Sequence, residues 1–208
     1  MHIKALILSL ASALVLSAPM PGEAQAGSSP DFERVSRADM EVGHRLPLTF
    51  VRLSHSDLEA GSRNFTGLSA QINLAFYENH WFALEYENLT GHNGGREFAR
   101  IAFGHGHPIN ANNLFFVETG FVRTRMIGRA DSESGVSFSV GTRSRLAPWF
   151  ELTVSANGES AARSWSSITE TFLRFESALL LTDSVDFHAG YDHREHSSQW
   201  RAGFRYAW

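Results

Sequence analysis

Two short segments contain histidines at spacings that metal sites use. Residues 192–196 read Asp-His-Arg-Glu-His, which places two histidines three positions apart beside carboxylates, and residues 105–107 read His-Gly-His. Imidazole nitrogens and carboxylate oxygens are common ligands of divalent cations. The ordinary alternative is that these are solvated polar groups in connections between strands. We expect the alternative, and therefore neither a metal nor a cofactor.

One segment contains the residue types of a hydrolytic triad. His55, Ser56 and Asp57 are consecutive. In a triad, the base must contact the nucleophile through one ring nitrogen and the orienting carboxylate through the other. Consecutive residues of one strand cannot adopt that arrangement, so this segment is weak support for an enzyme.

Arginines form a third group of residues that could bind a ligand. A guanidinium group binds phosphate oxygens through two parallel hydrogen bonds. The arginines of the polar segments could therefore hold lipopolysaccharide phosphates, or they could be ordinary surface charge; they are Arg63, Arg123, Arg125, Arg129, Arg163 and Arg194.

The N-terminus has the features of an export signal. Lys4 precedes an uninterrupted small and apolar run from position 5 to 18, and residues 24–26, Ala-Gln-Ala, match a small-residue cleavage site. The run is short for a membrane-spanning helix, which argues against an uncleaved anchor. We predict that residues 1–26 are removed and that residues 27–47 form an N-terminal periplasmic segment.

Composition narrows the class of protein further. The chain has 208 residues, no cysteine and a formal net charge of −4. The absence of cysteine excludes disulfides and thiolate metal sites. The lack of a basic surplus argues against nucleic acid as a partner. Beyond the N-terminus no apolar run is long enough for a transmembrane helix, which leaves a soluble globular domain or a β-barrel.

Alternation of apolar and polar residues dominates residues 48–208. In residues 68–76, for example, Leu68, Ile72 and Leu74 fall on one face and Gln71 and Asn73 on the other, as expected for strands with unlike faces. Connections of two lengths alternate along the chain: short ones at 78–80, 108–113, 146–149 and 182–184, and longer polar ones at 57–64, 90–97, 123–135, 157–167 and 192–198. This asymmetry predicts an all-β, transmembrane, up-and-down antiparallel barrel with both ends in the periplasm. We count ten strands, with eight as the alternative.

Charged residues occupy one face of the predicted strands. None falls on the apolar face, whereas the opposite face carries fourteen: Arg52, Glu85, Glu87, Arg100, Glu118, Arg143, Glu151, Glu170, Arg174, Glu176, Asp186, Asp192, Arg201 and Arg205. So many ions would destabilise the core of a soluble β-sandwich. A membrane barrel reverses the arrangement, with an apolar outside and a polar lumen, so we predict that these residues line the lumen.

Aromatic residues gather near both ends of the predicted strands. Two such girdles are expected at the interfaces of a membrane barrel. The set near the short connections is Phe76, Trp81, Phe82, Trp149, Phe150, Phe187, Tyr206 and Trp208, and the set near the longer connections is Tyr86, Phe98, Phe121, Trp165, Tyr191 and Trp200.

The last strand resembles the β-signal of bacterial outer-membrane proteins. Residues 203–208, Gly-Phe-Arg-Tyr-Ala-Trp, place Phe204, Tyr206 and Trp208 on one face. That resemblance implies recognition by the barrel-assembly machinery. The hairpin over residues 72–89 resembles the second and third strands of small OmpA-type barrels, and the overall layout is similar to small porin-like outer-membrane proteins.

These patterns predict an integral protein of the outer membrane of a Gram-negative bacterium. Ten strands lie close to the eight-stranded barrels that side chains fill. We therefore expect a porin-like or structural barrel with a narrow, salt-bridged lumen, whose loops engage lipopolysaccharide or external partners. The alternative is a barrel hydrolase with a rim active site, resembling the lipid A deacylases or outer-membrane proteases. Neither family's motif can be matched residue by residue, so we expect no enzyme.

Overall fold

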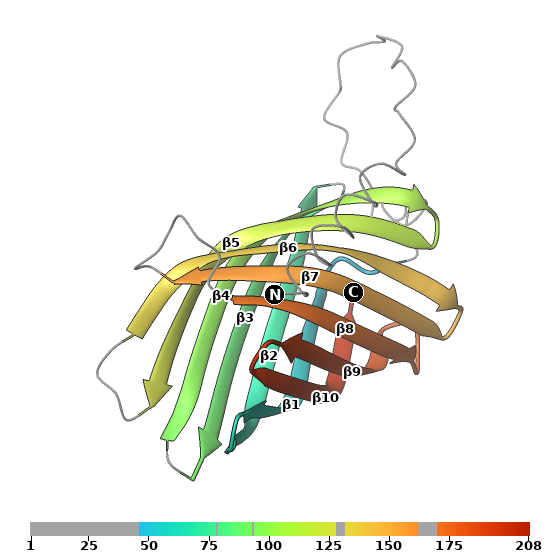
Figure 1. The fold of residues 1–208 in the computed structure, drawn as a ribbon. Helices are drawn as coiled ribbons and strands as arrows, with labels where there is room; N and C mark the ends of the chain where they lie inside the picture. Colours follow the sequence, from blue (N-terminus) through green and yellow to red (C-terminus); the bar gives the residue numbers. More distant parts are fainter. Residues whose placement is uncertain (1–45, 78, 93, 128–131, 162–169) are drawn as a thin grey trace.

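The computed structural model describes residues 46–77, 79–92, 94–127, 132–161 and 170–208 (Figure 1). The predicted signal peptide and residues 27–45 of the predicted periplasmic segment lie outside this part of the chain. The strands are β1 (Phe50–Ala60), β2 (Arg63–Tyr77), β3 (His80–Gly91), β4 (Gly94–Asn110), β5 (Asn113–Ile127), β6 (Ser132–Ala147), β7 (Phe150–Ala161), β8 (Glu170–Leu180), β9 (Val185–Arg194) and β10 (Ser197–Ala207). Within the described residues, no helix is long and apolar enough to cross a membrane.

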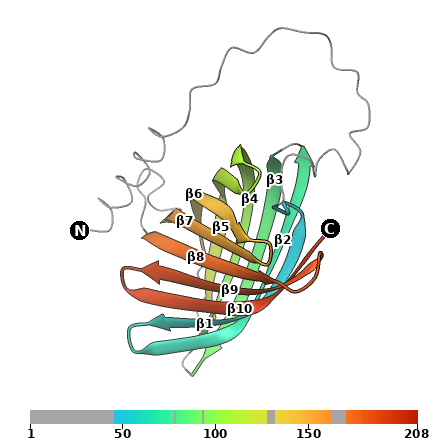
Figure 2. The same ribbon diagram turned by 90° about the vertical axis from the view of Figure 1, so that its right-hand side faces the viewer.

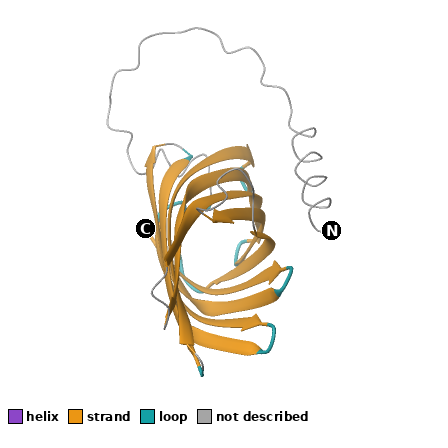
Figure 3. Ribbon diagram, turned by 60° about the vertical axis from the view of Figure 1, so that its left-hand side comes forward, coloured by secondary structure: helices purple, strands orange, loops and turns teal. Residues whose placement is uncertain are grey.

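The ten strands form one closed antiparallel barrel. Each strand pairs with its neighbours along the chain, and β1 pairs with β10 to close the sheet. Figures 2 and 3 show the strands wrapping around a common axis. The predicted all-β, up-and-down barrel is confirmed, with ten strands rather than eight. Because Phe50 lies opposite Ala207, β1 begins and β10 ends at the same end, here called the terminal end. The opposite end is called the distal end.

Alternation along each strand separates the two faces of the wall. In β3, every second residue from Trp81 to Leu89 is buried and the residues between them are exposed. Successive side chains of a strand point to opposite faces of the sheet, so the period of two in the sequence becomes an interior and an exterior. The exterior of the barrel exposes many large apolar side chains, including Leu68 and Phe121, at 69% and 63% exposure.

The prediction of five long connections at the distal end is wrong for three of them, which are short. Only residues 61–62 separate β1 from β2, with Gly61 at a φ of 62°, and only residues 195–196 separate β9 from β10. β3 and β4 run to within two residues of each other, at Gly91 and Gly94. The strands extend because ladder hydrogen bonds need only the backbone, and polar side chains on both faces are tolerated where the strand reaches water.

The other two predicted long connections begin or end later than expected. β5 continues to Ile127, β6 begins at Ser132, and β7 continues to Ala161. Their remaining residues, with Arg129, Arg163 and Trp165 among them, lie outside the described part of the chain. The connections at the terminal end are short as predicted, with only residues 111–112 between β4 and β5.

Two of the predicted girdle aromatics face the interior instead. Trp81 is 3% exposed and Phe98 is 6% exposed. Each follows the alternation of its own strand: Trp81 lies on the same face of β3 as Glu85, and Phe98 on the same face of β4 as Arg100. This alternation, and not the position near a strand end, decides which way the side chain points. By contrast, Phe82, Trp149 and many other girdle residues are exposed on the outer wall; the further exposed ones are Phe76, Tyr86, Phe121, Trp200, Tyr206 and Trp208.

The seam between β1 and β10 depends on a glycine. A Cβ atom added at Gly203 would lie 2.0 Å from the backbone oxygen of Leu53. We expect Gly203→Val to destabilise the folded barrel by about 1–3 kcal/mol, the range for overpacking, and to weaken resistance to SDS. The measurement is gel mobility without boiling, because a closed barrel migrates differently from the boiled chain. Ala202→Val, whose side chain lies on the exposed face of β10, is the matched control, and equal mobility shifts in the two variants would contradict the prediction.

Candidate functional site: an ion-paired barrel interior

Charged side chains meet across the middle of the barrel. The Glu85 carboxylate of β3 lies 3.8 Å from Arg174 on β8, 3.7 Å from Arg201 on β10 and 4.0 Å from Arg100 on β4. Asp192 on β9 accepts two hydrogen bonds from Arg174, of 2.9 and 3.0 Å, and one of 2.6 Å from Arg201. We call these five residues the central cluster. Two carboxylates thereby share three guanidinium groups.

The central cluster continues toward the wall on both sides. Arg100 donates a 2.6 Å hydrogen bond to Glu118, which also accepts one of 2.9 Å from the indole nitrogen of Trp81. Across the barrel, Arg52 donates 2.9 and 3.0 Å hydrogen bonds to Glu176 and Gln71. A buried ion is tolerated only when it is paired and hydrogen-bonded, and these contacts supply that pairing.

A second group of ion pairs lies nearer the terminal end. Glu151 on β7 accepts hydrogen bonds from Arg145 and Arg205, of 2.5 and 2.6 Å. Arg205 also donates a 2.7 Å hydrogen bond to Asp186. The guanidinium carbons of Arg205 and Arg52 lie 5.4 and 5.3 Å from the centre of a buried aromatic ring, that of Phe50.

Residues that precede β1 enter the terminal end of the barrel. Leu46 is 3% exposed and packs among apolar interior side chains, namely Trp81, Ala83, Ala102, Leu114 and Phe116. The backbone oxygen of Pro47 accepts a 2.9 Å hydrogen bond from Arg143. Arg143 also lies 5.6 Å from the centre of the Phe50 ring. This segment therefore lies inside the barrel mouth and contributes an acceptor to a buried cation.

Ion pairs and an aromatic ring also meet toward the distal end. The guanidinium group of Arg194 lies 3.9 Å from the centre of the Phe172 ring and 2.9 Å from the carboxylate of Glu170. Glu87 accepts a hydrogen bond from the side-chain amide of Gln199. Cation–π contact strengthens when the cation is desolvated, so Arg194 contributes to filling the interior.

Two of the cavities between these side chains are small. Two interior cavities have volumes of about 40 and 10 Å³. The first lies among Arg100, Arg143 and Glu176 and the second beside Arg52 and Glu85. A single water needs roughly 10–15 Å³ of such volume. These cavities are on the scale of one or a few waters.

The structure places all fourteen predicted lumen charges on the inner face of the wall. Most of them join the ion pairs described above, and Glu87 pairs with an amide instead. Sequence reasoning missed further ionisable residues of the interior, among them Arg145, Arg194 and His188. Arg194 was predicted in a distal loop. The signal that could have placed it is the alternation of β9, which continues without interruption from Asp186 to Arg194.

The segment with the residue types of a triad, residues 55–57, does not form one. Ser56 points inward and bonds the hydroxyl of Ser69 at 3.0 Å, while His55 and Asp57 are exposed on the outer wall. The hydroxyl of Thr66 lies 3.0 Å from Nε2 of His55, but the Asp57 carboxylate approaches the same nitrogen, at 3.5 Å. An orienting carboxylate must bond the other ring nitrogen, so His55 is not set up as a general base.

The histidine segments likewise give no metal centre in the described part of the chain. No group of three or more histidine, cysteine, aspartate or glutamate side chains there is arranged to hold a metal ion. His193 is exposed and contacts the hydroxyl of Tyr191 at 3.4 Å, and His105 contacts His80 at 3.0 Å.

A closed ten-stranded barrel with an apolar outer wall and an ion-paired interior is the architecture of outer-membrane β-barrel proteins. Solved structures with this fold include the NanC porin, with a TM-score of 0.50 and 7% identity over 76% of this chain and 100% of that chain. The KdgM porin in complex with disordered oligogalacturonate has a TM-score of 0.45 and 10% identity over 76% and 99%. Neisserial surface protein A has a TM-score of 0.36 and 12% identity over 77% and 96%.

No protein-family model and no curated protein sequence matches the chain. At such low identities the solved structures show the fold alone. The resemblance to small outer-membrane barrels that the sequence indicated is confirmed at this level.

Proposed function

We propose that this protein is an integral outer-membrane barrel of the porin-like kind, whose lumen is closed by its own ion pairs in the resting state. The exposed apolar side chains of the outer wall face lipid. The start of β1 and the end of β10 both lie on the periplasmic side. The fold shared with the NanC porin and the polar interior support a porin-like barrel over a barrel with a purely structural role.

A contact across the full width of the barrel carries the proposal. In the closed order of strands, β3 and β8 are five strands apart in either direction, so they lie opposite each other. Glu85 of β3 nevertheless lies 3.8 Å from Arg174 of β8. Side chains from opposite walls therefore meet and obstruct the lumen at this level. Attraction between such charges is stronger here than in water because the surroundings are less polarisable.

The segment before β1 adds a second obstruction at the terminal end. Leu46 packs against apolar side chains inside the mouth, and the backbone oxygen of Pro47 accepts a hydrogen bond from Arg143. Passage of a solute would therefore require movement both at the central cluster and at this segment. We infer small or intermittent conductance for the unmodified protein.

Removing the arginines that bridge the lumen should open it. In the double variant Arg174→Ala, Arg201→Ala, the Glu85 and Asp192 carboxylates lose most of their partners, and water replaces the two long side chains. We expect a higher single-channel conductance in planar bilayers and a preference for cations, because acidic rings select cations. Arg125→Ala, which lies on the outer wall with its side chain 56% exposed, is the control.

A heat-dependent gel shift identifies variants that still fold, so that a loss of conductance through misfolding is recognised. A large and steady conductance of the unmodified protein would contradict the closed lumen. Lipid deacylation or peptide cleavage by the purified protein, abolished by His55→Ala, would favour the hydrolase alternative.

The C-terminal strand exposes aromatic side chains that the assembly machinery could recognise. Phe204, Tyr206 and Trp208 are exposed on the outer wall, at 58%, 53% and 48%. Their rings are therefore available to a partner before the barrel reaches lipid. We include recognition of these residues by the barrel-assembly machinery in the proposal.

A further inference from the structure

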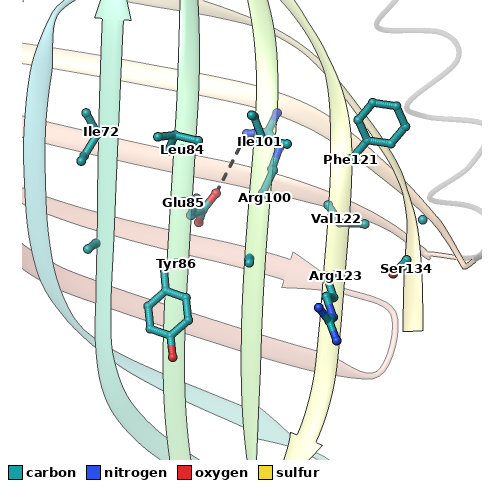
Figure 4. Close-up of a pocket in the computed structure, with 13 residues that line it drawn as sticks. Ile72, Leu84, Glu85, Tyr86, Arg100, Ile101, Phe121, Val122, Arg123 and Ser134 are labelled. Carbon is teal, nitrogen blue, oxygen red and sulfur yellow. Dashed lines mark ion pairs between the residues drawn. The ribbon is translucent and has the colours of Figure 1, made fainter. Parts of the chain in front are cut away.

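The outer wall has a depression of about 510 Å³ that extends across β2 to β6 (Figure 4). Binding sites for small molecules have volumes of roughly 300–1,000 Å³. The depression is lined almost wholly by apolar atoms except at its distal edge. It lies on the face that we propose is in lipid. Glu85 and Arg100 of the central cluster are also among its lining residues, but they are buried on the inner face of the wall.

Two rows of side chains form this depression. The row nearer the terminal end is wholly apolar and consists of Ile72, Leu84, Ile101 and Phe121, which are consecutive partners in the ladders. The row nearer the distal end alternates in size and consists of Ala70, Tyr86, Ala99, Arg123 and Ser134, paired in the same way. Ala99 therefore leaves a gap between the Tyr86 ring and the Arg123 side chain.

The distal edge of the gap carries a cation. Arg123 is exposed, and it donates a long side-chain hydrogen bond, 3.4 Å, to the hydroxyl of Ser132. Among the described residues Arg123 forms no ion pair, whereas the nearby Arg125 lies 3.5 Å from Glu97. Figure 4 shows the Arg123 guanidinium and the Tyr86 hydroxyl both pointing toward the distal end of the wall. A ligand with an apolar chain and an anionic head matches this arrangement.

We propose that the depression binds lipopolysaccharide, with one acyl chain over Ala99 between Tyr86 and Phe121 and a headgroup phosphate on Arg123. The choice of this lipid rests on the proposed function, since that orientation places the distal end in the outer leaflet. A guanidinium binds phosphate oxygens through paired hydrogen bonds. The apolar row supplies the hydrophobic contact that holds the chain.

The experiment measures lipid retained by the full-length mature protein. The protein is reconstituted into phosphatidylcholine nanodiscs containing a few percent of diphosphorylated lipid A, and bound lipid is counted by native mass spectrometry. Ala99→Phe fills the gap and Arg123→Gln removes the cation. We expect Arg123→Gln to retain lipid A about tenfold more weakly, the loss expected for one charge-assisted hydrogen bond. Ala99→Phe should also retain it more weakly, because the acyl chain loses the gap in which it lies.

Matched controls separate the groove from the rest of the wall. Ala202→Phe introduces the same bulk on the exposed face of β10, and Arg125→Gln removes a neighbouring cation that is already paired. Both controls should retain lipid A as the unmodified protein does. Dephosphorylated lipid A should bind the unmodified protein about tenfold more weakly than lipid A does. It should bind Arg123→Gln no more weakly than lipid A binds that variant.

Two results would overturn this inference. One is equal retention by Ala99→Phe, Arg123→Gln and the unmodified protein. The other is equal retention of lipid A and phosphatidylglycerol, which would make the groove a general anionic-lipid site. Failure of the protein to insert into nanodiscs, seen as loss of the heat-dependent gel shift, would instead contradict the proposed function.

Discussion

Replacing Asp192 by Asn should lower the free energy of unfolding by about 3–5 kcal/mol, the cost of leaving buried charges without their partner. Asp192 is fully buried and accepts hydrogen bonds from Arg174 and Arg201, and Arg194 lies 3.8 Å away. The amide keeps the shape of the side chain but not its charge. Arg174 and Arg201 would then keep only the Glu85 carboxylate as an ion-pair partner. Arg194 would keep Glu170.

The measurement is reversible urea unfolding in lipid vesicles, followed by tryptophan fluorescence. Glu97→Gln is the control, because it neutralises a partly exposed carboxylate paired with Arg125 on the outer wall. Exposed pairs contribute about 0–1 kcal/mol. Equal losses in the two variants would show that the interior is hydrated and that the central cluster is not a plug.

Replacing Phe175 by Arg should destabilise the barrel in lipid by about 2–4 kcal/mol, the cost of a charge on the lipid face near the bilayer midplane. Phe175 is 41% exposed, and its partners in the ladders are Val154 and Tyr191. All three side chains lie on the outer wall. The guanidinium group would have no partner there and would need water to reach it.

The control for Phe175 lies on the same strand and the same face. Thr171 is four residues nearer the distal end, which is about 13 Å along a strand. Thr171→Arg should therefore place its charge near the headgroups and cost about 0–1 kcal/mol. Equal destabilisation by the two substitutions in urea refolding would contradict the proposed depth of the barrel in the membrane.

The two faces of the wall could be predicted for the centres of the strands. Alternation placed Glu85 and Arg100 inside and Leu84 and Ile101 outside, and the structure has them so. The pattern holds because strand side chains alternate strictly and a shift of one residue would move every apolar side chain to the wrong face. The C-terminal residues were assigned to the outer face by the same argument.

Strand ends could not be predicted from the same pattern. Arg194 was expected in a loop because polar residues surround it, yet β9 continues through it and buries it against Phe172. Trp81 was expected at the membrane surface, yet its indole bonds Glu118 inside. Near the distal end no apolar face marks where a strand stops, because both faces are polar.

The sequence by itself determined the class of fold and which side chains of the strand centres face inward, since both follow from local periodicity, and it favoured ten strands over eight. Only the tertiary structure decided that Glu85 reaches Arg174 across the barrel, that Leu46 enters the mouth, and that Ala99 opens a groove beside Arg123. Those contacts depend on the curvature and stagger of the closed sheet. Curvature and stagger arise from the pairing of all ten strands together, and no single segment encodes them.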